Sequence, residues 1–472
     1  MKKNDSITPN HQSIGILLAA GFSTRMKSAR PKVLHEICGW PLIYYPIEAF
    51  KKAGIKKIIV VVGYKKEAVT RCLEAQYKNL IFVTQKTPSG TADAVKAALP
   101  VLRKEEGDVL IGNGDAPLLN PFTIKKLCFL HANKKAEITL LSAQFENPPP
   151  YGRILRGNDD HVKKIVEDKD ATPEQRQIQE VNAGLYCVKI GFLLNTLQKI
   201  SNSNKKNEFY LPDMVGFSES AFVLKTSNPD EILGINHRAD LEKVRMIIQE
   251  EINEAHMLNG VTLVGSQNIH IDHDVHIEED TTVYSNTHLK GKTNIGKNTI
   301  IESNCLIVNS HIKDDCHIKQ GSIIEESIIE NKVSVGPLAH LRPGTHLQEG
   351  SRVGNFVELK KTTLGKNSKA NHLTYLGDAE IGTNVNIGCG VITCNFDGGP
   401  HKHKSVIEDN VFVGSDVQLI APVTIGKGAY VASGSSINKN VPPHALAIAR
   451  ERQVNKPGYA KKILKMKKKR VE

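Results

Sequence analysis

The stretch IDHDVHIEEDTTVYSNTHLKGKTNIGKNTIIESNCLI, residues 271–307, carries an aliphatic residue at every sixth position. The seven positions are Ile271, Ile277, Val283, Leu289, Ile295, Ile301 and Ile307. An α-helix repeats after about 3.6 residues and a strand after about two, so neither produces a period of six. A repeat of this length is typical of a hexapeptide β-helix, in which each unit forms one side of a coil and stacked coils bury the aliphatic row.

The repeat continues toward the C-terminus in two further series. Its members are Leu341, Leu347, Val353 and Leu359, and then Ile407, Val413, Leu419, Ile425, Val431 and Ile437. The period lapses at residues 393–405, where Asn395, Asp397, Gly398, Gly399 and Pro400 indicate a loop that leaves the coil. Insertions into solenoids often carry function. We therefore expect a left-handed parallel β-helix of hexapeptide repeats over residues 260–472, ending in a basic tail.

Upstream of the repeat, short apolar runs alternate with amphipathic segments. Strands are expected at residues 14–19, 57–62, 80–85, 109–112 and 138–144, and helices at residues 42–53, 91–102 and 121–131. This alternation is typical of βα units around a mainly parallel sheet. Residues 238–257 contain no Gly or Pro, and their apolar residues recur at steps of three and four. The sequence thus predicts a Rossmann-like α/β domain at residues 1–237 and a linker helix at residues 238–259.

Composition limits the class of protein. The chain has 472 residues, 40% of them hydrophobic and 24% charged, and its apolar runs are too short to span a membrane. Eight cysteines without CxxC spacing are typical of reduced thiols, and the N-terminus lacks a secretory apolar core. We therefore expect a cytoplasmic protein. Half of the net charge of +12 lies in the last twelve residues, where seven Lys or Arg and one Glu give +6. Lys465 and residues 467–470 could contact RNA or membrane phosphates, but a terminal run of charges is more often solvated. We therefore interpret this tail as solvated, with no nucleic acid as partner.

The first candidate site follows the strand at residues 14–19. That strand runs directly into Gly21, and Arg25 and Lys32 come shortly after it. A glycine at the carboxyl end of a strand lets backbone N–H groups approach phosphate oxygens, and the two cations add positive charge. Transfer at a triphosphate requires such donors, because charge develops in the transition state. The segment is neither a Walker A motif nor GxGxxG.

With its flanks, the segment LAAGFSTRMKSARPKVL, residues 18–34, resembles the signature of sugar-1-phosphate nucleotidyltransferases. Further matching stretches follow in order: Gln85 with residues 89–91, GDAPL at 114–118, YGRI at 151–154, VEDKDA at 166–171 and NAG at 182–184. With the hexapeptide half included, nearly the whole chain is similar to the bacterial family of bifunctional N-acetylglucosamine-1-phosphate uridyltransferase/glucosamine-1-phosphate acetyltransferases. The resemblance implies UTP and N-acetylglucosamine-1-phosphate as substrates of the first site.

The resemblance also assigns residues to that site. The uridine nucleotide would contact Leu18, Ala19, Ala20, Gly21, Gln85, Gly90 and Thr91, its phosphates Arg25 and Lys32, and the N-acetylglucosamine Gly152, Glu167 and Asn182. Asp115 and Asn236 would bind Mg²⁺, which prefers oxygen ligands and shares its coordination with substrate phosphates. Two positions depart from the family pattern: Ser23 replaces a glycine, and Asn113 replaces an aromatic residue.

The second candidate site lies within the repeat. Acetyl transfer from a thioester to an amine needs a base, and the pKa of histidine suits this role near neutrality. His372 is fourteen residues after Glu358, less than one coil of about eighteen residues, so the two side chains could face each other on adjacent coils. The carboxylate would then fix the tautomer of the ring. The resemblance implies the same roles, with His372 as base and Glu358 supporting it.

The resemblance supplies the remaining residues of the second site. Arg342 and Lys360 would bind the phosphate of glucosamine-1-phosphate, and Tyr375 and Asn386 the sugar. Acetyl-CoA would contact Cys389, Asn395, Phe396, Lys402, Ser415, Ser433 and Arg450. Cys389 and Ser433 stand where the family has alanines, Phe396 stands where it has a tyrosine, and the loop around Lys402 is one residue longer.

Together these features predict a bifunctional enzyme, a homotrimer by resemblance, that makes UDP-N-acetylglucosamine from glucosamine-1-phosphate, acetyl-CoA and UTP. One alternative keeps only nucleotidyl transfer and makes the β-helix a non-catalytic assembly domain. The other makes the chain a scaffold subunit, in which Lys32 and Asp115 should be missing, whereas both are present.

Overall fold

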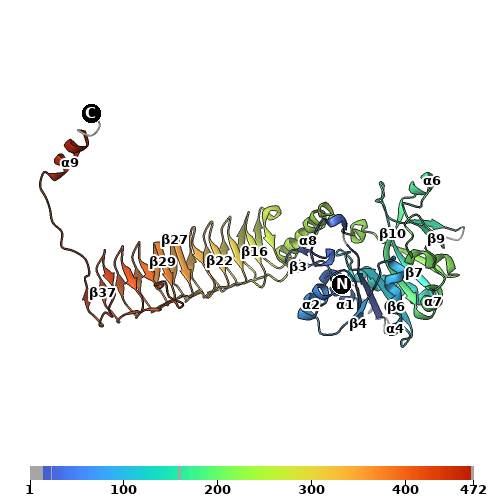
Figure 1. The fold of residues 1–472 in the computed structure, drawn as a ribbon, viewed down its shortest axis with the longest axis horizontal. Coiled ribbons are helices and arrows are strands. Elements are labelled where there is room, and N and C mark those ends of the chain that lie inside the picture. The colour runs from blue at the N-terminus through green and yellow to red at the C-terminus, as the bar shows by residue number, and fades with distance from the viewer. Residues whose placement is uncertain (1–13, 23, 158–160, 469–472) are drawn as a thin grey trace. The chain divides into compact units, whose positions relative to one another are not determined.

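The computed structural model describes residues 14–22, 24–157 and 161–468. Ser23 and the last four residues of the basic tail lie outside the described residues. The chain divides into two compact units, up to Glu250 and from Glu251 onward, so the division falls inside the long helix α8 (Arg238–Leu258). Figure 1 shows the two units, an α/β unit and a stack of β-helix coils, each of which is described separately.

The first unit is built on one mixed sheet. Its strands are β1 (Ile14–Ala19), β4 (Lys57–Val62), β5 (Leu80–Thr84), β6 (Asp108–Asn113), β7 (Ile138–Gln144), β8 (Arg153–Arg156), β9 (Val162–Val166), β10 (Glu180–Lys189) and β11 (Ala221–Lys225). The main path is β11-β7-β10-β6-β1-β4-β5, in which only β10 runs antiparallel to its neighbours. The predicted mainly parallel sheet is therefore present, with β1 in its interior between β6 and β4.

Helices cover both faces of this sheet. They are α1 (Tyr44–Lys52), α2 (Lys66–Gln76), α3 (Thr91–Lys96), α4 (Leu99–Leu102), α5 (Pro121–Lys134), α6 (Pro173–Arg176) and α7 (Ile190–Thr196), with a short hairpin of β2 (Glu36–Ile37) and β3 (Trp40–Pro41). Alternate residues of β1 enter two separate cores: Leu17 packs with α1, α2 and α5, and Ile16 with α3, α4 and α7. Burial on both faces explains why the central strands are continuous apolar runs.

One predicted helix is divided. Residues 91–102 form α3 and α4 rather than a single helix. Pro100 lies in the first turn of α4, and its nitrogen could not donate to the carbonyl of residue 96 in a continuous helix. Helix α2 was not predicted, because its exposed polar face leaves only Val69 and Leu73 fully buried.

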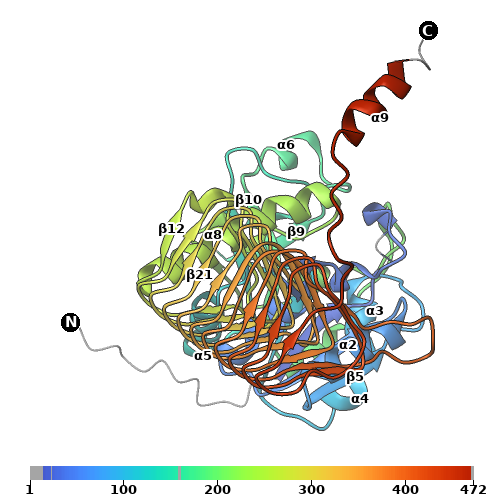
Figure 2. The ribbon, with the colours of Figure 1, turned by 90° about the vertical axis from the view of Figure 1, so that its left-hand side faces the viewer.

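The second unit is a parallel β-helix with three faces, and Figure 2 shows its stacked coils nearly end on. The first face contains β12 (Thr262–Val264), β15 (Thr282–Tyr284), β18 (Ile300–Ile301), β21 (His317–Ile318), β24 (Ser334–Val335), β31 (Asn386–Ile387), β34 (Phe412–Val413), β37 (Tyr430–Val431) and β39 (Leu446–Ala447). The second contains β13 (His270–Ile271), β16 (His288–Lys290), β19 (Leu306–Val308), β22 (Ile323–Glu325), β25 (His340–Leu341), β32 (Ile392–Cys394), β35 (Gln418–Ile420) and β38 (Ser436–Ile437). The third contains β14 (His276–Ile277), β17 (Asn294–Ile295), β20 (His311–Ile312), β23 (Ile328–Ile329), β26 (His346–Leu347), β28 (Thr363–Leu364), β30 (Ala379–Ile381), β33 (Ser405–Ile407) and β36 (Val423–Ile425).

Two long strands, β27 (Arg352–Lys360) and β29 (Lys369–Gly377), continue around a corner from the first face to the second. Their first residues pair with the first face and their last residues with the second, and the corners fall at Phe356 and Leu373, which have positive φ. These two strands therefore connect the first and second faces, and they contain Glu358, Lys360, His372 and Tyr375 of the second candidate site.

The three series of six-residue steps are parts of one continuous inner row. The row continues between them through Ile312, Ile318, Ile324, Ile329 and Val335, and later through Leu364, Leu376 and Ile381, all nearly fully buried. Four intervals between successive inner residues are five positions long instead of six. Each of them ends at an inner residue on the third face: 307–312, 324–329, 359–364 and 376–381. The expected loop is also present, because no strand lies between Cys394 and Ser405 in this fully described segment. Among the described residues, none of the helices is long and apolar enough to cross a bilayer.

Candidate functional site

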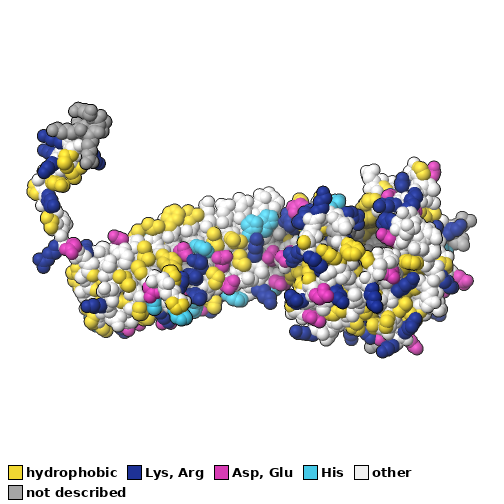
Figure 3. Space-filling view, in the orientation of Figure 1, with side chains coloured by type: hydrophobic (Ala, Val, Ile, Leu, Met, Phe, Trp, Pro, Cys, Tyr) yellow, Lys and Arg dark blue, Asp and Glu magenta, His cyan; other side chains and the backbone are white. Residues whose placement is uncertain are grey.

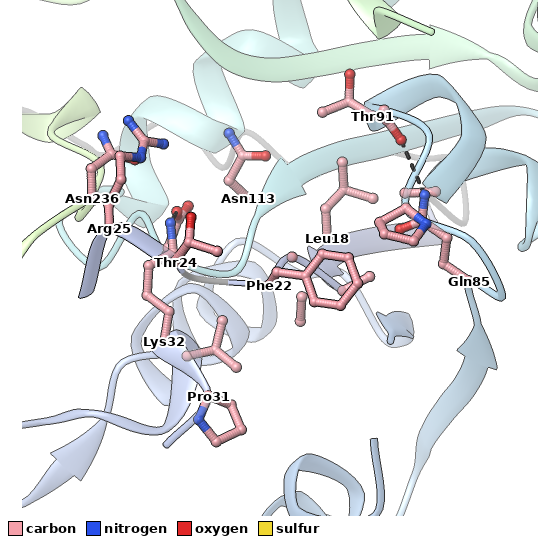
Figure 4. A pocket seen from close by; sticks show the side chains of 18 of the residues that line it. Leu18, Phe22, Thr24, Arg25, Pro31, Lys32, Gln85, Thr91, Asn113 and Asn236 are labelled. Atoms are coloured by element: carbon pink, nitrogen blue, oxygen red, sulfur yellow. Dashed lines mark hydrogen bonds and ion pairs between the residues drawn. The ribbon is translucent and has the colours of Figure 1, made fainter. Parts of the chain in front are cut away.

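A cleft of about 460 Å³ opens at the carboxyl end of β1. It contains every predicted nucleotide and phosphate residue: Leu18, Ala19, Ala20, Gly21, Arg25, Lys32, Gln85, Gly90 and Thr91. In Figure 4, Gln85 and Thr91 lie at one end of the cleft and Arg25 and Lys32 toward the other. The cleft is therefore polar at one end and cationic at the other, and residues 18–21 also line it.

A tight backbone contact forms the polar end of this cleft. Gly90 has φ of +120°, and a Cβ there would lie 2.4 Å from the carbonyl oxygen of Phe209. Gln85 donates from Nε2 to the carbonyl oxygen of Gly90 and to Asp93 Oδ2, at 3.2 and 2.8 Å. The hydroxyl of Thr91 accepts from the backbone N–H of Leu211 at 2.9 Å. Only glycine fits at position 90, and its neighbours are fixed by hydrogen bonds.

A second cleft of about 450 Å³ adjoins the first and holds the predicted sugar residues Gly152, Glu167 and Asn182. They lie close together, since a Cβ on Gly152 would be 3.4 Å from Glu167 Oε1 and 3.6 Å from Asn182 Cβ. Asn182 donates from Nδ2 to Tyr186 Oη at 2.6 Å and accepts from the N–H of Gly184 at 3.1 Å. Burial raises the pKa of Glu167 above its ordinary value. These polar groups form a fixed, partly dehydrated surface.

Five residues line both clefts and mark where they join: Arg25, Thr91, Asn113, Asp115 and Asn236. The two predicted Mg²⁺ ligands, Asp115 and Asn236, are among them. The N–H of Ile235 donates to the carbonyl oxygen of Asp115 at 3.1 Å, which holds the two segments together, and Lys32 forms an ion pair with the Asp115 carboxylate. A carboxylate and an amide oxygen beside a phosphate-sized space fit Mg²⁺, which takes oxygen ligands.

Asn113, one of the two departures in the first site, also lies at this junction. A Cβ on Gly184, which has φ of +73°, would come within 2.6 Å of Asn113 Nδ2. The amide of Asn113 therefore occupies the space beside β10 that a side chain at position 184 would need.

In the β-helix, the corner between the first and second faces aligns the predicted acetyl-transfer residues in one column. Asn355 pairs in register with His372, and the N–H of Gly390 donates to the carbonyl of Leu373 at 2.8 Å, which places Cys389 beside His372. The N–H of Asp416 donates to the carbonyl of Cys389 at 2.7 Å. The column then continues through Ser415 and Ser433, whose hydroxyl accepts from the N–H of Ser415 at 3.1 Å, and ends near Arg450.

A group of cations lies on the second face, beyond the corner. Arg342 and Lys360 are neighbours on adjacent strands, since Arg342 N–H donates to Leu359 O at 2.9 Å, and Tyr375 is next to Glu358 in register. Lys402, on the loop after β32, and Arg342 lower the pKa of Lys360 by charge repulsion. The same loop is anchored by Asn395, which donates from Nδ2 to Asp378 Oδ2 at 2.6 Å. Phe396 is exposed, with Lys402 Nζ 6.0 Å from its ring.

The single chain does not bring Glu358 to His372. Glu358 lies past the corner at Phe356 and pairs with Arg342, Oε1 to Nη1 at 2.7 Å. Instead, the residue that contacts the His372 ring is Asn355, whose Oδ1 lies 3.1 Å from His372 Nδ1. Sequence reasoning missed Asn355, because the fourteen-residue spacing of Glu358 and His372 does not reveal where the corner falls. Asn386, the second predicted sugar residue, lies on the first face beside Lys369.

Family models match parts of both units of the chain. Residues 14–214 match the family model described as nucleotidyl transferase, residues 266–345 a GMPPB C-terminal domain, and residues 404–439 six repeats of the bacterial transferase hexapeptide. Proteins named bifunctional protein GlmU from Trichlorobacter lovleyi and Geotalea uraniireducens are 44% and 45% identical over 454 and 448 residues, covering 95% and 94% of this chain and 98% of each relative. The chain belongs to the GlmU family. A GlmU protein from Shouchella clausii is 43% identical over 451 residues, which is 95% of this chain.

Membership of the GlmU family confirms the predicted fold class, a nucleotidyltransferase domain followed by a left-handed hexapeptide β-helix, and confirms that the chain is an enzyme. Both alternatives, a lone nucleotidyltransferase and a scaffold subunit, leave the β-helix without chemistry. Relatives named bifunctional protein GlmU match 94% to 96% of this chain, so neither alternative is supported.

Proposed function

We propose how the two activities of this bifunctional enzyme, uridyl transfer and acetyl transfer in the synthesis of UDP-N-acetylglucosamine, are divided over its two sites. The joined clefts of the first unit carry uridyl transfer, and the corner column of the β-helix carries acetyl transfer. The observation that carries this proposal is the junction at Arg25, Asp115 and Asn236, where a nucleotide cleft meets a sugar cleft. A phosphate bonded to the sugar and the α-phosphate of UTP would meet at that junction.

Uridyl transfer requires no protein nucleophile, because the phosphate oxygen of N-acetylglucosamine-1-phosphate attacks the α-phosphorus of UTP and pyrophosphate leaves. Lys32 and Arg25 bind phosphate oxygens and offset the charge that develops. Asp115 and Asn236 would hold Mg²⁺, which when bound supplies further positive charge at the phosphates. Glu167 and Asn182 orient the sugar, so that its phosphate is positioned for in-line attack.

Acetyl transfer uses His372 as base. Because Nδ1 donates to Asn355 Oδ1, the lone pair of the ring lies on Nε2, which takes the proton from the amine of glucosamine-1-phosphate as it attacks the thioester carbonyl. The tetrahedral intermediate then collapses and releases the CoA thiol. Arg342, held by Glu358, binds the sugar phosphate together with Lys360. Acetyl-CoA lies along the column from Cys389 to Arg450.

A closed trimer remains part of this proposal. Phosphate-binding cations and the base occupy different faces on either side of one corner, and in a cyclic assembly one copy's first face could meet another copy's second face. A cytoplasmic location is likewise proposed, because Cys128, Cys187, Cys305 and Cys316 are buried thiols that form no disulfide bond.

The test supplies the purified protein with glucosamine-1-phosphate, acetyl-CoA, UTP and Mg²⁺ and measures CoA, pyrophosphate and UDP-sugar separately. All three products are expected. CoA without UDP-sugar, or pyrophosphate only when N-acetylglucosamine-1-phosphate is supplied, would show that one site is inactive.

We predict that the pH dependence of sugar binding reports on Glu167. Burial raises the pKa of its carboxyl group, so the carboxylate is lost at a higher pH than that of an exposed glutamate. We expect the KM for N-acetylglucosamine-1-phosphate to rise as the pH falls through this raised pKa. Glu167→Gln should raise the KM for N-acetylglucosamine-1-phosphate at neutral pH, and this KM should then change less as the pH falls. If the KM of Glu167→Gln still rose at acid pH as in the wild type, the rise would be due to protonation of the substrate phosphate instead.

We predict that iodoacetamide inactivates acetyl transfer through Cys389, the only one of the eight described cysteines that is exposed. The added group would occupy the space beside His372 where the thioester must lie, and we expect a loss of roughly tenfold or more. Uridyl transfer, assayed on the same sample, should not change. Cys389→Ala should be active and resistant; inactivation of this variant at the same rate would exclude Cys389 as the site.

A further inference from the structure

The loop between β32 and β33, residues 395–404, is closed by one carboxylate. His403 Nε2 lies 2.9 Å from Asp397 Oδ2, and the N–H of Gly399 donates to Asp397 Oδ1 at 2.9 Å. The N–H of Gly399 and the ring of His403 hold the pKa of the Asp397 carboxyl below its ordinary value. Because an ionised carboxylate only accepts hydrogen bonds, Nε2 of His403 donates in this pair. The N–H of His403 also donates to the carbonyl oxygen of Asn395 at 2.9 Å, so the two sides of the loop are joined twice.

The start of this loop is fixed to the β-helix, but the rest is not. Asn395 is buried and donates from Nδ2 to Asp378 Oδ2 at 2.6 Å. A Cβ on Gly377 would lie 2.6 Å from the same Nδ2, so the amide packs directly against the end of β29. Residues 396–404 are all described, and none of them is buried. The loop beyond Asn395 therefore has no packed core, and its conformation depends on polar contacts, among which those of Asp397 join its two sides.

Lys402 lies on this loop near the cations of the second site. Many Lys and Arg side chains of the β-helix lie next to Asp or Glu side chains, as Figure 3 shows on its visible face. The charge of Lys402 is instead the largest cause that lowers the pKa of Lys360, followed by the charge of Arg342, and Asp378 offsets this repulsion only in part. Like charges repel, so Lys402 would move away from Lys360 unless the loop were held closed. An anion bound between these cations would remove the repulsion.

We propose that Asp397 and His403 form a clasp that positions Lys402. Held by the clasp, Lys402 lies beside Lys360 and Arg342, and the three cations bind the phosphate of glucosamine-1-phosphate. The resemblance assigns Lys402 to acetyl-CoA, whereas its charge acts on Lys360. The inference rests on the proposed assignment of Arg342 and Lys360 to the sugar phosphate. Asp397 and His403 are positioning residues, because they restrict the motion of Lys402 before the substrate binds and so reduce the entropy lost on binding.

Steady-state kinetics of acetyl transfer by the full-length protein test the clasp. His403→Ala should raise the KM for glucosamine-1-phosphate about tenfold, the size expected for one charge-assisted hydrogen bond, and leave kcat nearly unchanged. Asp397→Ala should do the same, and the double variant should be no worse than either single variant, because both remove one contact. His403→Gln keeps a donor and should restore most of the affinity. His401→Ala, a change at an exposed histidine of the same loop, is the matched control and should leave this KM unchanged.

A second series of variants separates the positioning of Lys402 from a general effect on the loop. Lys402→Met should itself raise the KM for glucosamine-1-phosphate. Adding His403→Ala to this variant should raise the KM no further, because the clasp acts through the ammonium group of Lys402. The KM for acetyl-CoA and the rate of uridyl transfer should stay at their wild-type values in every variant.

Four results would overturn the inference. A wild-type KM in His403→Ala, beside a raised KM in Arg342→Ala, would exclude the clasp but leave the phosphate site in place. A further rise when His403→Ala is added to Lys402→Met would show that His403 acts on another group. A rise in the KM for acetyl-CoA alone would place Lys402 at the coenzyme. If Arg342→Ala and Lys360→Ala both kept the wild-type KM for glucosamine-1-phosphate, the proposed phosphate site itself would be refuted.

Discussion

Replacing His372 by alanine should abolish CoA release while UDP-N-acetylglucosamine is still made from N-acetylglucosamine-1-phosphate and UTP. A general base contributes roughly 100- to 10,000-fold to such a step, and we expect the kcat for acetyl transfer to fall within that range. The ring is hydrogen-bonded at Nδ1 to Asn355, so in the proposed mechanism its Nε2 accepts the proton. His372 is exposed at a corner, and its removal leaves the buried inner row intact.

Variants of the residues around His372 distinguish the general base from the residues that position it or the substrate. Asn355→Ala removes the acceptor for Nδ1 and should lower kcat while shifting the pH–rate profile. Glu358→Gln weakens the ion pair with Arg342 and should act mainly on the KM for glucosamine-1-phosphate. His346→Ala, a change of another histidine on the same β-helix, is the matched control. Loss of uridyl transfer in His372→Ala would refute independent sites, and an unchanged rate of CoA release would refute the assignment of the base.

The repeat shows how far the sequence determines this fold. A period of six was sufficient to predict coils with an aliphatic interior, because every inner position needs one apolar side chain of similar size. The five-residue steps, such as Leu359 to Leu364, interrupted the period in the sequence although the row itself is unbroken. Each five-residue step contains one residue of positive φ, and these residues, Asn309, Glu326, Lys361 and Asp378, share no residue type that would reveal the shorter step in the sequence.

The two sites differed in how well they could be predicted. In the first unit, strand ends bring Gly21, Gln85 and Asp115 to one edge of the sheet, so family motifs in chain order were sufficient to identify the clefts. In the β-helix, neighbours come from adjacent coils, and a shift of one residue at a corner changes every pair. The contact between Asn355 and His372 could therefore be found only from the strand register in the structure. Within one chain, Glu358 forms an ion pair with Arg342.

Asp115→Asn should cause the largest loss in the first unit. The change preserves shape but removes the carboxylate that Lys32 pairs with and that would hold Mg²⁺ at the junction of the two clefts. Loss of one preorganised electrostatic group typically costs about 100- to 1,000-fold in kcat, and we expect a loss of that size in pyrophosphate release. Acetyl transfer should be unaffected.

Metal binding gives a second measurement that does not depend on turnover. In the presence of UTP, Mn²⁺ used as a probe for the Mg²⁺ site should bind the wild-type protein, and its electron paramagnetic resonance signal should show weaker binding to Asp115→Asn. Asp108→Asn is the matched control, because Asp108 begins the same strand β6 that ends just before Asp115. Equal Mn²⁺ binding by Asp115→Asn and wild type would remove Asp115 from the metal site. If kcat nevertheless fell, the role of Asp115 would be to position Lys32 against the phosphates.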